Sequence, residues 1–197
     1  RVRTVAGNDN LMEFGLRRAQ GKSAGVYGAR SAMIGGFNGT SNVLAGAKFG
    51  MPILGTMAHS WVMSFSSELE AFRAYTRQYP NNLILLADTY NTLKQGVPDA
   101  ITIFKEMKEA GTLPKAYGIR LDSGDLAYLS KEAHKMFAAA GFGDAIIAAS
   151  NDLDENLISE LKSQGCCINS WGVGTNLITA KDSPSLGGVF KLVGQYD

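Results

Sequence analysis

Six short apolar runs constrain the fold of this chain more than any other feature of its sequence. They lie at residues 52–54, 83–86, 117–121, 145–149, 166–168 and 188–193. The apolar residues in each run are continuous rather than alternating, which is typical of strands that are covered on both faces and therefore parallel. We expect all six to be strands of one parallel sheet.

Stretches with helical periodicity separate most of these runs. We predict helices at residues 11–20, 28–34, 61–72, 98–110, 126–140 and 157–161. Glu68 and Glu70 in the third of these, and Arg73 directly after it, lie off its apolar stripe. Strand and helix alternate about every 20 to 35 residues, which predicts repeated βα units, and both an open doubly wound sheet and a closed barrel fit. No clear linker interrupts the chain, so we predict one domain, residues 1–197.

Charge and cysteine usage limit the partners and the compartment. The net charge is +1 and no basic stripe is present, so neither nucleic acid nor an anionic membrane is an expected partner. No apolar run reaches the roughly 18 residues of a spanning helix. Cys166 and Cys167 are adjacent on a predicted strand and would point to opposite faces, so we expect reduced thiols in a cytoplasmic protein. The chain opens on Arg1, and we expect a piece of a longer protein.

Polar side chains, and two glycines in the last case, follow each of the first five predicted strands. In chain order these are Thr56 and His59; Asp88; Arg120, Asp122, Ser123 and Asp125; Ser150, Asn151 and Asp152; and Gly172, Gly174, Thr175 and Asn176. The carboxyl ends of parallel strands converge on one face, where ligands bind. Helix capping is the alternative explanation, above all for Ser123, Asn151 and Asp152.

Two of these segments point to an anionic ligand. Arg120 lies inside an apolar run, where a cation costs several kcal/mol unless it is paired with Asp122 or with a ligand. The segment GVGTN, residues 172–176, can turn backbone N–H groups toward a phosphate, although it is neither a Walker nor a Rossmann motif. The second histidine, His134, is predicted to be a surface residue, and the histidines and cysteines make no zinc spacing.

Together, the arginine, the phosphate-type loop, the carboxylates and His59 suit a phosphorylated sugar that develops positive charge at carbon. A carboxylate about 4 Å from such a centre contributes roughly 4 kcal/mol at an effective dielectric constant of 20.

Several motifs, taken in order, resemble the nicotinate phosphoribosyltransferases. They are EFGLRR (13–18), GFNGTSN (36–42), GTMAH (55–59), IRLDSGD (119–125), GVGTN (172–176) and GGVFK (187–191). The resemblance implies an irregular α/β barrel of the type II phosphoribosyltransferase kind, here incomplete. It also implies a reaction in NAD salvage, in which nicotinate and phosphoribosyl pyrophosphate (PRPP) give nicotinate mononucleotide and pyrophosphate, driven by ATP.

The resemblance further implies roles for individual residues. His59 would be phosphorylated by ATP as a nucleophile, Asp122 would face the ribose, and Asp88 would lie on the ribose–pyrophosphate side, with a contact to Mg²⁺. The predicted binding residues are Thr56, Arg120 and Phe14 for nicotinate, Arg17 for phosphates, and Ser150, Asn151, Gly174 and Thr175 for the 5′-phosphate. The family also implies a homodimer with a shared active site.

Ser41 bears on the choice of substrate. Enzymes that use nicotinamide have an aspartate at this position, which would repel a carboxylate, so Ser41 favours nicotinate. The alternatives are the nicotinamide-using relatives and a non-catalytic barrel fragment that binds phosphosugars. The quinolinate enzymes share the fold but would need more basic residues. If parts of the enzyme are missing, the chain would carry most of the catalytic face without necessarily being active alone.

Overall fold

Six parallel strands form one curved sheet in the order β2-β1-β6-β5-β4-β3. The computed structural model describes residues 1–179 and 181. The strands are β1 (Asn10–Glu13), β2 (Gly39–Thr40), β3 (Leu83–Leu86), β4 (Tyr117–Leu121), β5 (Ile146–Ala149) and β6 (Ser170–Val173). The first strand pairs with the last one described, so that Asn10 lies opposite Ser170 and Glu13 opposite Val173.

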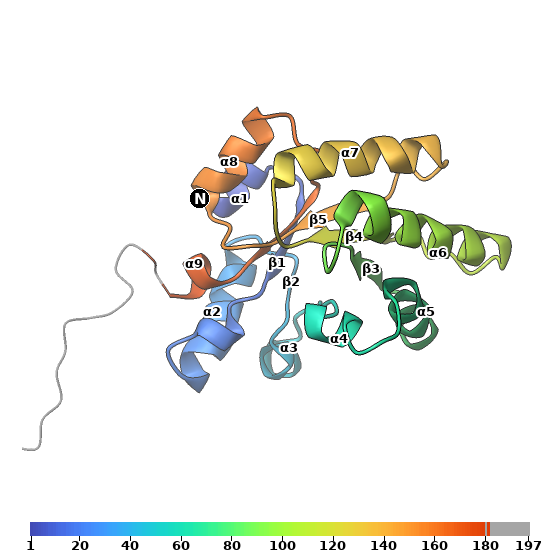
Figure 1. Ribbon diagram of the computed structural model, residues 1–197. Coiled ribbons are helices and arrows are strands. Elements are labelled where there is room, and N and C mark those ends of the chain that lie inside the picture. Colours follow the sequence, from blue (N-terminus) through green and yellow to red (C-terminus); the bar gives the residue numbers. More distant parts are fainter. Residues whose placement is uncertain (180, 182–197) are drawn as a thin grey trace, which may run out of the picture.

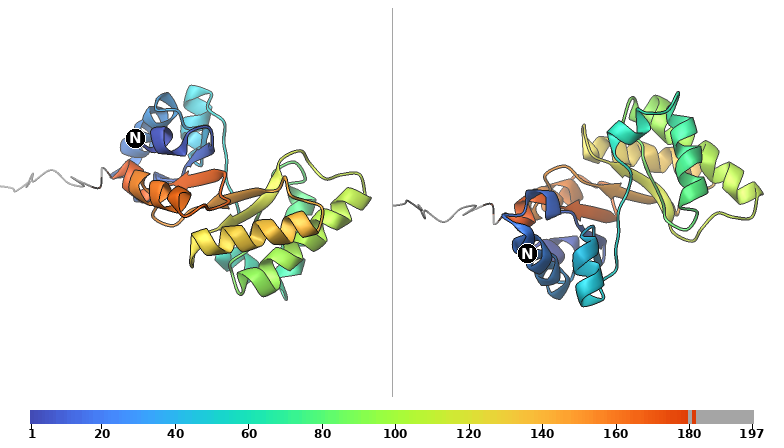
Figure 2. Two further views of the ribbon diagram at one scale, coloured as in Figure 1. Left: turned by 90° about the horizontal axis from the view of Figure 1, so that it is seen from above. Right: turned by 90° about the horizontal axis from the view of Figure 1, so that it is seen from below.

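Helices surround the sheet, as Figure 1 and the two views of Figure 2 show. They are α1 (Val2–Ala6), α2 (Lys22–Ile34), α3 (Val43–Phe49), α4 (His59–Val62), α5 (Glu68–Gln78), α6 (Val97–Glu109), α7 (Leu126–Ala139), α8 (Glu155–Ser163) and α9 (Thr175–Ile178), with a 3₁₀ turn η1 (Leu16–Arg18) and a π turn η2 (Thr92–Gly96). Within the described residues, none of them has the length and apolar character of a membrane span.

Three of the predicted strands are confirmed as β3, β4 and β5. Strands β3 and β4 have the predicted bounds, and β5 begins one residue later than expected. Helices α6, α7 and α8 also occur where they were predicted, and the expected helix at residues 28–34 is the second half of α2. The sheet is curled and open, with β2 and β3 at its edges, which agrees with an incomplete barrel.

Helix capping explains Asp125 among the polar residues at the strand ends, but not Ser123, Asn151 or Asp152. Asp125 caps α7 by accepting a hydrogen bond from the N–H of Tyr128 at 2.9 Å. Asp154 caps α8 in the same way at 2.8 Å. Ser123, Asn151 and Asp152, which the capping alternative invoked, are therefore left for another role.

Three predicted elements are wrong. Residues 11–20 are not a helix, because Leu11 and Met12 are buried in β1 between β2 and β6. The run at 52–54 makes only an isolated bridge from Ile53 to Thr40, and the edge strand is instead β2. The run at 166–168 precedes the true strand β6, whose Trp171 and Val173 are fully buried.

Two further expectations need adjustment. The helix predicted at 61–72 is divided into α4 and α5, and Ser67 caps the second helix by accepting from the N–H of Glu70 at 3.2 Å. Cys166 and Cys167 are free thiols, as expected, but they are half-buried and lie outside any strand. The strand at 188–193 and the motif at 187–191 lie outside the described residues.

Candidate active site

A cavity of about 440 Å³ opens at the carboxyl ends of the strands. Every residue that the family resemblance gave a role lines it except Asp88, which contacts His59. Of the other residues predicted at the strand ends, Ser123, Asp125 and Asn176 do not line it. The predicted residues that line the cavity are Phe14, Arg17, Ser41, Thr56, His59, Arg120, Asp122, Ser150, Asn151, Gly174 and Thr175. Residues that are distant in sequence thus meet where parallel α/β folds bind ligands.

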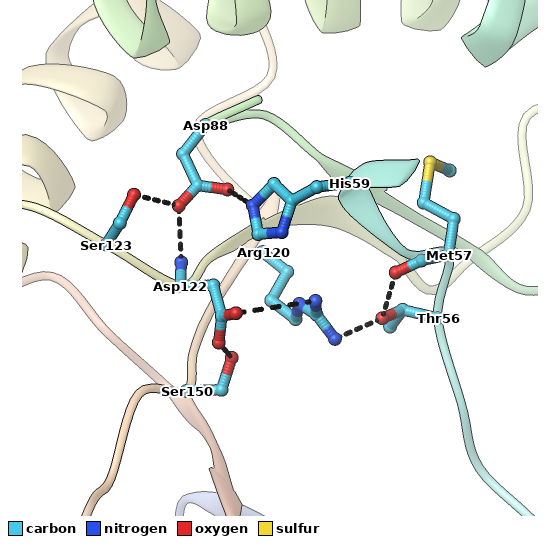
Figure 3. Close-up of polar contacts among 8 residues, drawn as sticks. All are labelled: Thr56, Met57, His59, Asp88, Arg120, Asp122, Ser123 and Ser150. Carbon is cyan, nitrogen blue, oxygen red and sulfur yellow. Dashed lines mark hydrogen bonds and ion pairs between the residues drawn. The ribbon is translucent and has the colours of Figure 1, made fainter. Parts of the chain in front are cut away.

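His59 is held by a buried carboxylate. Its Nε2 lies 3.0 Å from Oδ1 of Asp88, whose side chain is only 1% exposed, whereas the histidine side chain is 38% exposed (Figure 3). The other Asp88 oxygen accepts from the N–H of Asp122 at 2.9 Å and from the hydroxyl of Ser123. Because a carboxylate only accepts, the neutral imidazole carries its proton on Nε2 and keeps a lone pair on Nδ1.

Arg120 projects from β4 into the cavity and is incompletely paired. Its Nη1 donates to Oγ1 of Thr56 at 2.6 Å, and its Nη2 lies 3.9 Å from Asp122 (Figure 3). Within the described residues its Nε has no partner, and the side chain is 13% exposed. Burial lowers the pKa of Arg120, while the charges of Asp122 and Asp88 act in the opposite direction. A guanidinium with free donors in such a place can bind an anion.

Asp122 is oriented by its neighbours. The Ser150 hydroxyl, from the loop after β5, donates to Oδ1 of Asp122. The side chain is about one-third exposed and lines the cavity. A fixed carboxylate there can stabilise positive charge that develops on a bound sugar.

Two loops on one side of the cavity are tied together. Asn151 and Asp152, after β5, have positive φ angles of 102° and 46°, a conformation that costs about 1–3 kcal/mol and is found mainly at functional sites. Asn176, in α9 after β6, donates from Nδ2 to the carbonyls of Asp152 at 2.6 Å and Leu153 at 3.2 Å. The backbone of both loops is thereby fixed beside Gly174.

Phe14 enters the cavity because its neighbours are small. A Cβ on Gly172 would lie 2.7 Å from the Phe14 ring, so any larger residue would displace it. Glu13, just before it, is buried in β1, where it accepts from the N–H of Gly15 and the hydroxyl of Thr40. These bonds connect β1 to β2 and fix the start of the loop that carries Phe14.

Some lining residues were not assigned a role from the sequence. They are Arg18, Gly55, Met57, Ala58, Asp152 and Gly172. Arg18 directly follows Arg17, and the pair of cations was a signal that could have identified it.

Comparison with known proteins places the chain in a family. The model of the nicotinate phosphoribosyltransferase (NAPRTase) family matches residues 10–191. The chain belongs to the nicotinate phosphoribosyltransferase family. Among curated members, the Bacillus subtilis nicotinate phosphoribosyltransferase is 51% identical over 193 residues, which are 98% of this chain and 39% of the relative. The Dictyostelium discoideum relative is 41% identical and again covers 98% of the chain.

Two solved structures have the same fold. The human nicotinic acid phosphoribosyltransferase superposes with a TM-score of 0.79 at 30% identity, covering 88% of this chain and 45% of its own length. The nicotinate-nucleotide pyrophosphorylase of Pyrococcus furiosus has a TM-score of 0.75 at 22% identity over 91% of this chain and 44% of its own, which supports the fold alone. The chain spans about two-fifths of the length of the two curated relatives above.

Proposed function

We propose that this chain carries the catalytic residues that transfer a phosphoribosyl group from PRPP to nicotinate, giving nicotinate mononucleotide and pyrophosphate in NAD salvage. One observation carries the proposal. A histidine held at Nε2 by the buried Asp88 lines one cavity together with Arg120 and the two loops after β5 and β6. Family membership supports the same reaction.

His59 would couple ATP hydrolysis to this transfer. Its Nδ1 keeps the lone pair, so this nitrogen would attack the γ-phosphorus of ATP, form an N–P bond and release ADP. The Nε2 proton stays hydrogen-bonded to Asp88. The Asp88 carboxylate then also balances the positive charge of the phosphorylated ring. Water later takes the phosphoryl group and restores the free imidazole.

The other residues would bind and orient the two remaining substrates. Arg120 and Thr56 would hold the nicotinate carboxylate, and Phe14 would cover one face of its ring. Asp122, fixed by the Ser150 hydroxyl, would face the ribose as the bond to pyrophosphate breaks. Bound phosphates would be contacted by Arg17, and the 5′-phosphate by Asn151, Gly174 and Thr175 in addition to Ser150.

Mg²⁺ would enter with the phosphates. Within the described residues no group of three His, Cys, Asp or Glu side chains could hold a metal ion. Both Asp88 oxygens are already engaged by His59, Ser123 and the Asp122 N–H, so Asp88 is poorly suited to the contact expected from the sequence. Asp122 and Asp152 are the carboxylates that line the cavity, and one carboxylate plus substrate phosphates is a common arrangement for Mg²⁺, which neutralises phosphate charge.

We also propose a compartment, a class of substrate and an assembly. The protein would work in the cytoplasm on small molecules. It would form a homodimer, and the partner subunit would complete the nicotinate site opposite Phe14. The non-catalytic alternative predicts phosphosugar binding without turnover.

The test is product formation. The chain is incubated with Mg²⁺, ATP, PRPP and either nicotinate or nicotinamide, and mononucleotide and ADP are quantified. We expect nicotinate mononucleotide, and ATP hydrolysis that nicotinate and PRPP stimulate. Product from nicotinamide would favour the sister enzymes, and PRPP binding with no ATP hydrolysis would favour the non-catalytic alternative.

Ser41 allows a test of acid against amide. Replacing Ser41 by aspartate adds a negative charge to the wall that would face the nicotinate carboxylate. We expect KM for nicotinate to rise by about 10- to 100-fold, in line with about 1.4–2.8 kcal/mol of repulsion. The matched control is Ser41→Asn. Asparagine has the same shape as aspartate without the charge, so this variant should change KM much less. An equal rise for both variants would mean that size, not charge, matters at this position.

A further inference from the structure

Glu68 is a buried carboxyl group that the proposed mechanism does not use. It is the first residue of α5, yet its side chain has no exposed surface. Neither carboxyl oxygen makes a hydrogen bond of normal geometry with any described residue. Capping does not explain its presence, because Ser67 caps this helix. The sequence had placed Glu68 off the apolar stripe, together with the exposed Glu70.

The group lies against the segment that holds His59. The backbone N–H of Thr89 faces the Glu68 carboxyl, and Thr89 directly follows Asp88. The hydroxyl of Thr89 is also buried and has no hydrogen-bond partner in the part of the chain that the structure describes. The Asp88 carboxylate therefore contacts His59, and the Glu68 carboxyl lies against the backbone of the next residue, Thr89.

The charges around Glu68 oppose its ionisation. Burial is the largest cause and, with the negative charges of Asp99 and Asp88, it raises the pKa of Glu68 from 4.5 to about 7, while the Thr89 N–H acts weakly in the opposite direction. Titratable groups on the elements packed against α5 are His59 on α4, Lys94 on η2, and Asp99, Lys105, Glu106, Lys108 and Glu109 on α6. Of these, Asp99 acts directly on Glu68.

We propose that Glu68 is a positioning residue for His59: in its neutral form it supports the Asp88–Thr89 segment and keeps the Asp88 carboxylate on the His59 ring. The role of this contact in phosphorylation rests on the proposed function. When Glu68 ionises, its buried negative charge repels that of Asp88, and this repulsion displaces Asp88 from Nε2. His59 then loses the contact that orients its Nδ1.

The first test is a direct titration that requires no activity. Carbon-13 spectra of the glutamate carboxyls are recorded against pH for the wild-type chain and for Glu68→Gln, which keeps the shape and removes the ionisation. We expect the signal that the substitution removes to titrate near pH 7, and the His59 ring signals of the wild type to show an additional change at that midpoint that is absent in Glu68→Gln. A signal with an ordinary midpoint near 4.5 would overturn the proposal.

The second test is the rate at which ATP phosphorylates His59 between pH 6 and 8.5. We expect the ratio of the Glu68→Gln rate to the wild-type rate to rise by roughly tenfold, which corresponds to one unit of pKa coupling. The matched control is Glu70→Gln, an exposed acid on the same helix, whose ratio should stay constant. A constant ratio for Glu68→Gln as well would mean a merely structural role. If no variant is phosphorylated but the titration behaves as expected, the proposed function fails and the positioning contact stands.

Thermal unfolding provides a third readout, with a definite sign. The folded chain binds the Glu68 proton more tightly than the unfolded chain, so this contribution to stability is complete below pH 4.5 and is lost as pH rises through about 7. The Tm of the wild type should therefore fall across this range relative to that of Glu68→Gln. Parallel curves for the two proteins would contradict the raised pKa.

Discussion

Replacing His59 by alanine is expected to abolish the transfer of the γ-phosphoryl group of ATP to the chain. The imidazole is the group that combines cavity exposure, a free Nδ1 lone pair and a buried carboxylate at Nε2. Among the described residues that line the cavity, no other side chain is an imidazole, so the loss should be complete rather than partial. The measurement is incorporation of ³²P from γ-labelled ATP, with the acid-labile, base-stable behaviour of a phosphohistidine.

The chain offers a matched control for this substitution. His134 is the second of its two histidines and lies on α7, away from the cavity. His134→Ala should keep the full label. A label that survives in His59→Ala, or disappears in both variants, would show that His59 is not the phosphorylated residue. Nitrogen-15 spectra of the labelled chain should place the phosphoryl group on Nδ1.

Replacing Gly118 by alanine is expected to destabilise the chain strongly. Gly118 lies in β4, opposite Ile146 of β5, and an added Cβ would lie 1.9 Å from the Ile146 carbonyl oxygen. That oxygen is backbone in the middle of the sheet, so relief requires the two strands to separate. We expect a loss of more than about 3 kcal/mol, out of a typical total of about 5–15 kcal/mol. The Tm should fall by roughly 10 °C.

The control for Gly118 is Gly143, which precedes β5. A Cβ at Gly143 would make only ordinary contacts with Ala138, at 3.7 and 3.8 Å. Gly143→Ala should therefore change the Tm by no more than a few degrees. If the two variants unfold at the same temperature, β4 and β5 can separate more easily than their pairing indicates.

The sequence predicted the strands that are apolar throughout and missed those that depend on distant partners. Strand β4 was found at its true bounds because its run is continuous and its neighbours in the sheet cover it. Strand β1 was missed because it ends on Glu13, whose charge fits a strand only once the Gly15 N–H and the Thr40 hydroxyl bind it. Hydrogen bonds to a residue as distant as Thr40 leave no pattern in the sequence around Glu13.

The same distinction applies to the candidate site. Residues after continuous strands, such as Asp122 and Ser150, were found because strand ends converge. The contact of Asp88 with His59 could not be predicted, since it joins segments 29 residues apart through side-chain orientation. Glu68 was placed off the apolar stripe because a carboxylate on an amphipathic helix is usually solvated, and only the packing of α5 against α6 and α4 buries it.

The pairing of β1 with β6 has a consequence for how the chain folds. The side chains of Asn10 and Ser170 that meet there are 160 residues apart, so this contact closes a very long loop. Closing such a loop is slow, and during synthesis the partner strand leaves the ribosome long after β1 does. The units from β3 to β5 pair mainly with their neighbours in sequence and can form earlier. The cavity, which needs Phe14 beside Gly172, is therefore among the last parts of the molecule to assemble.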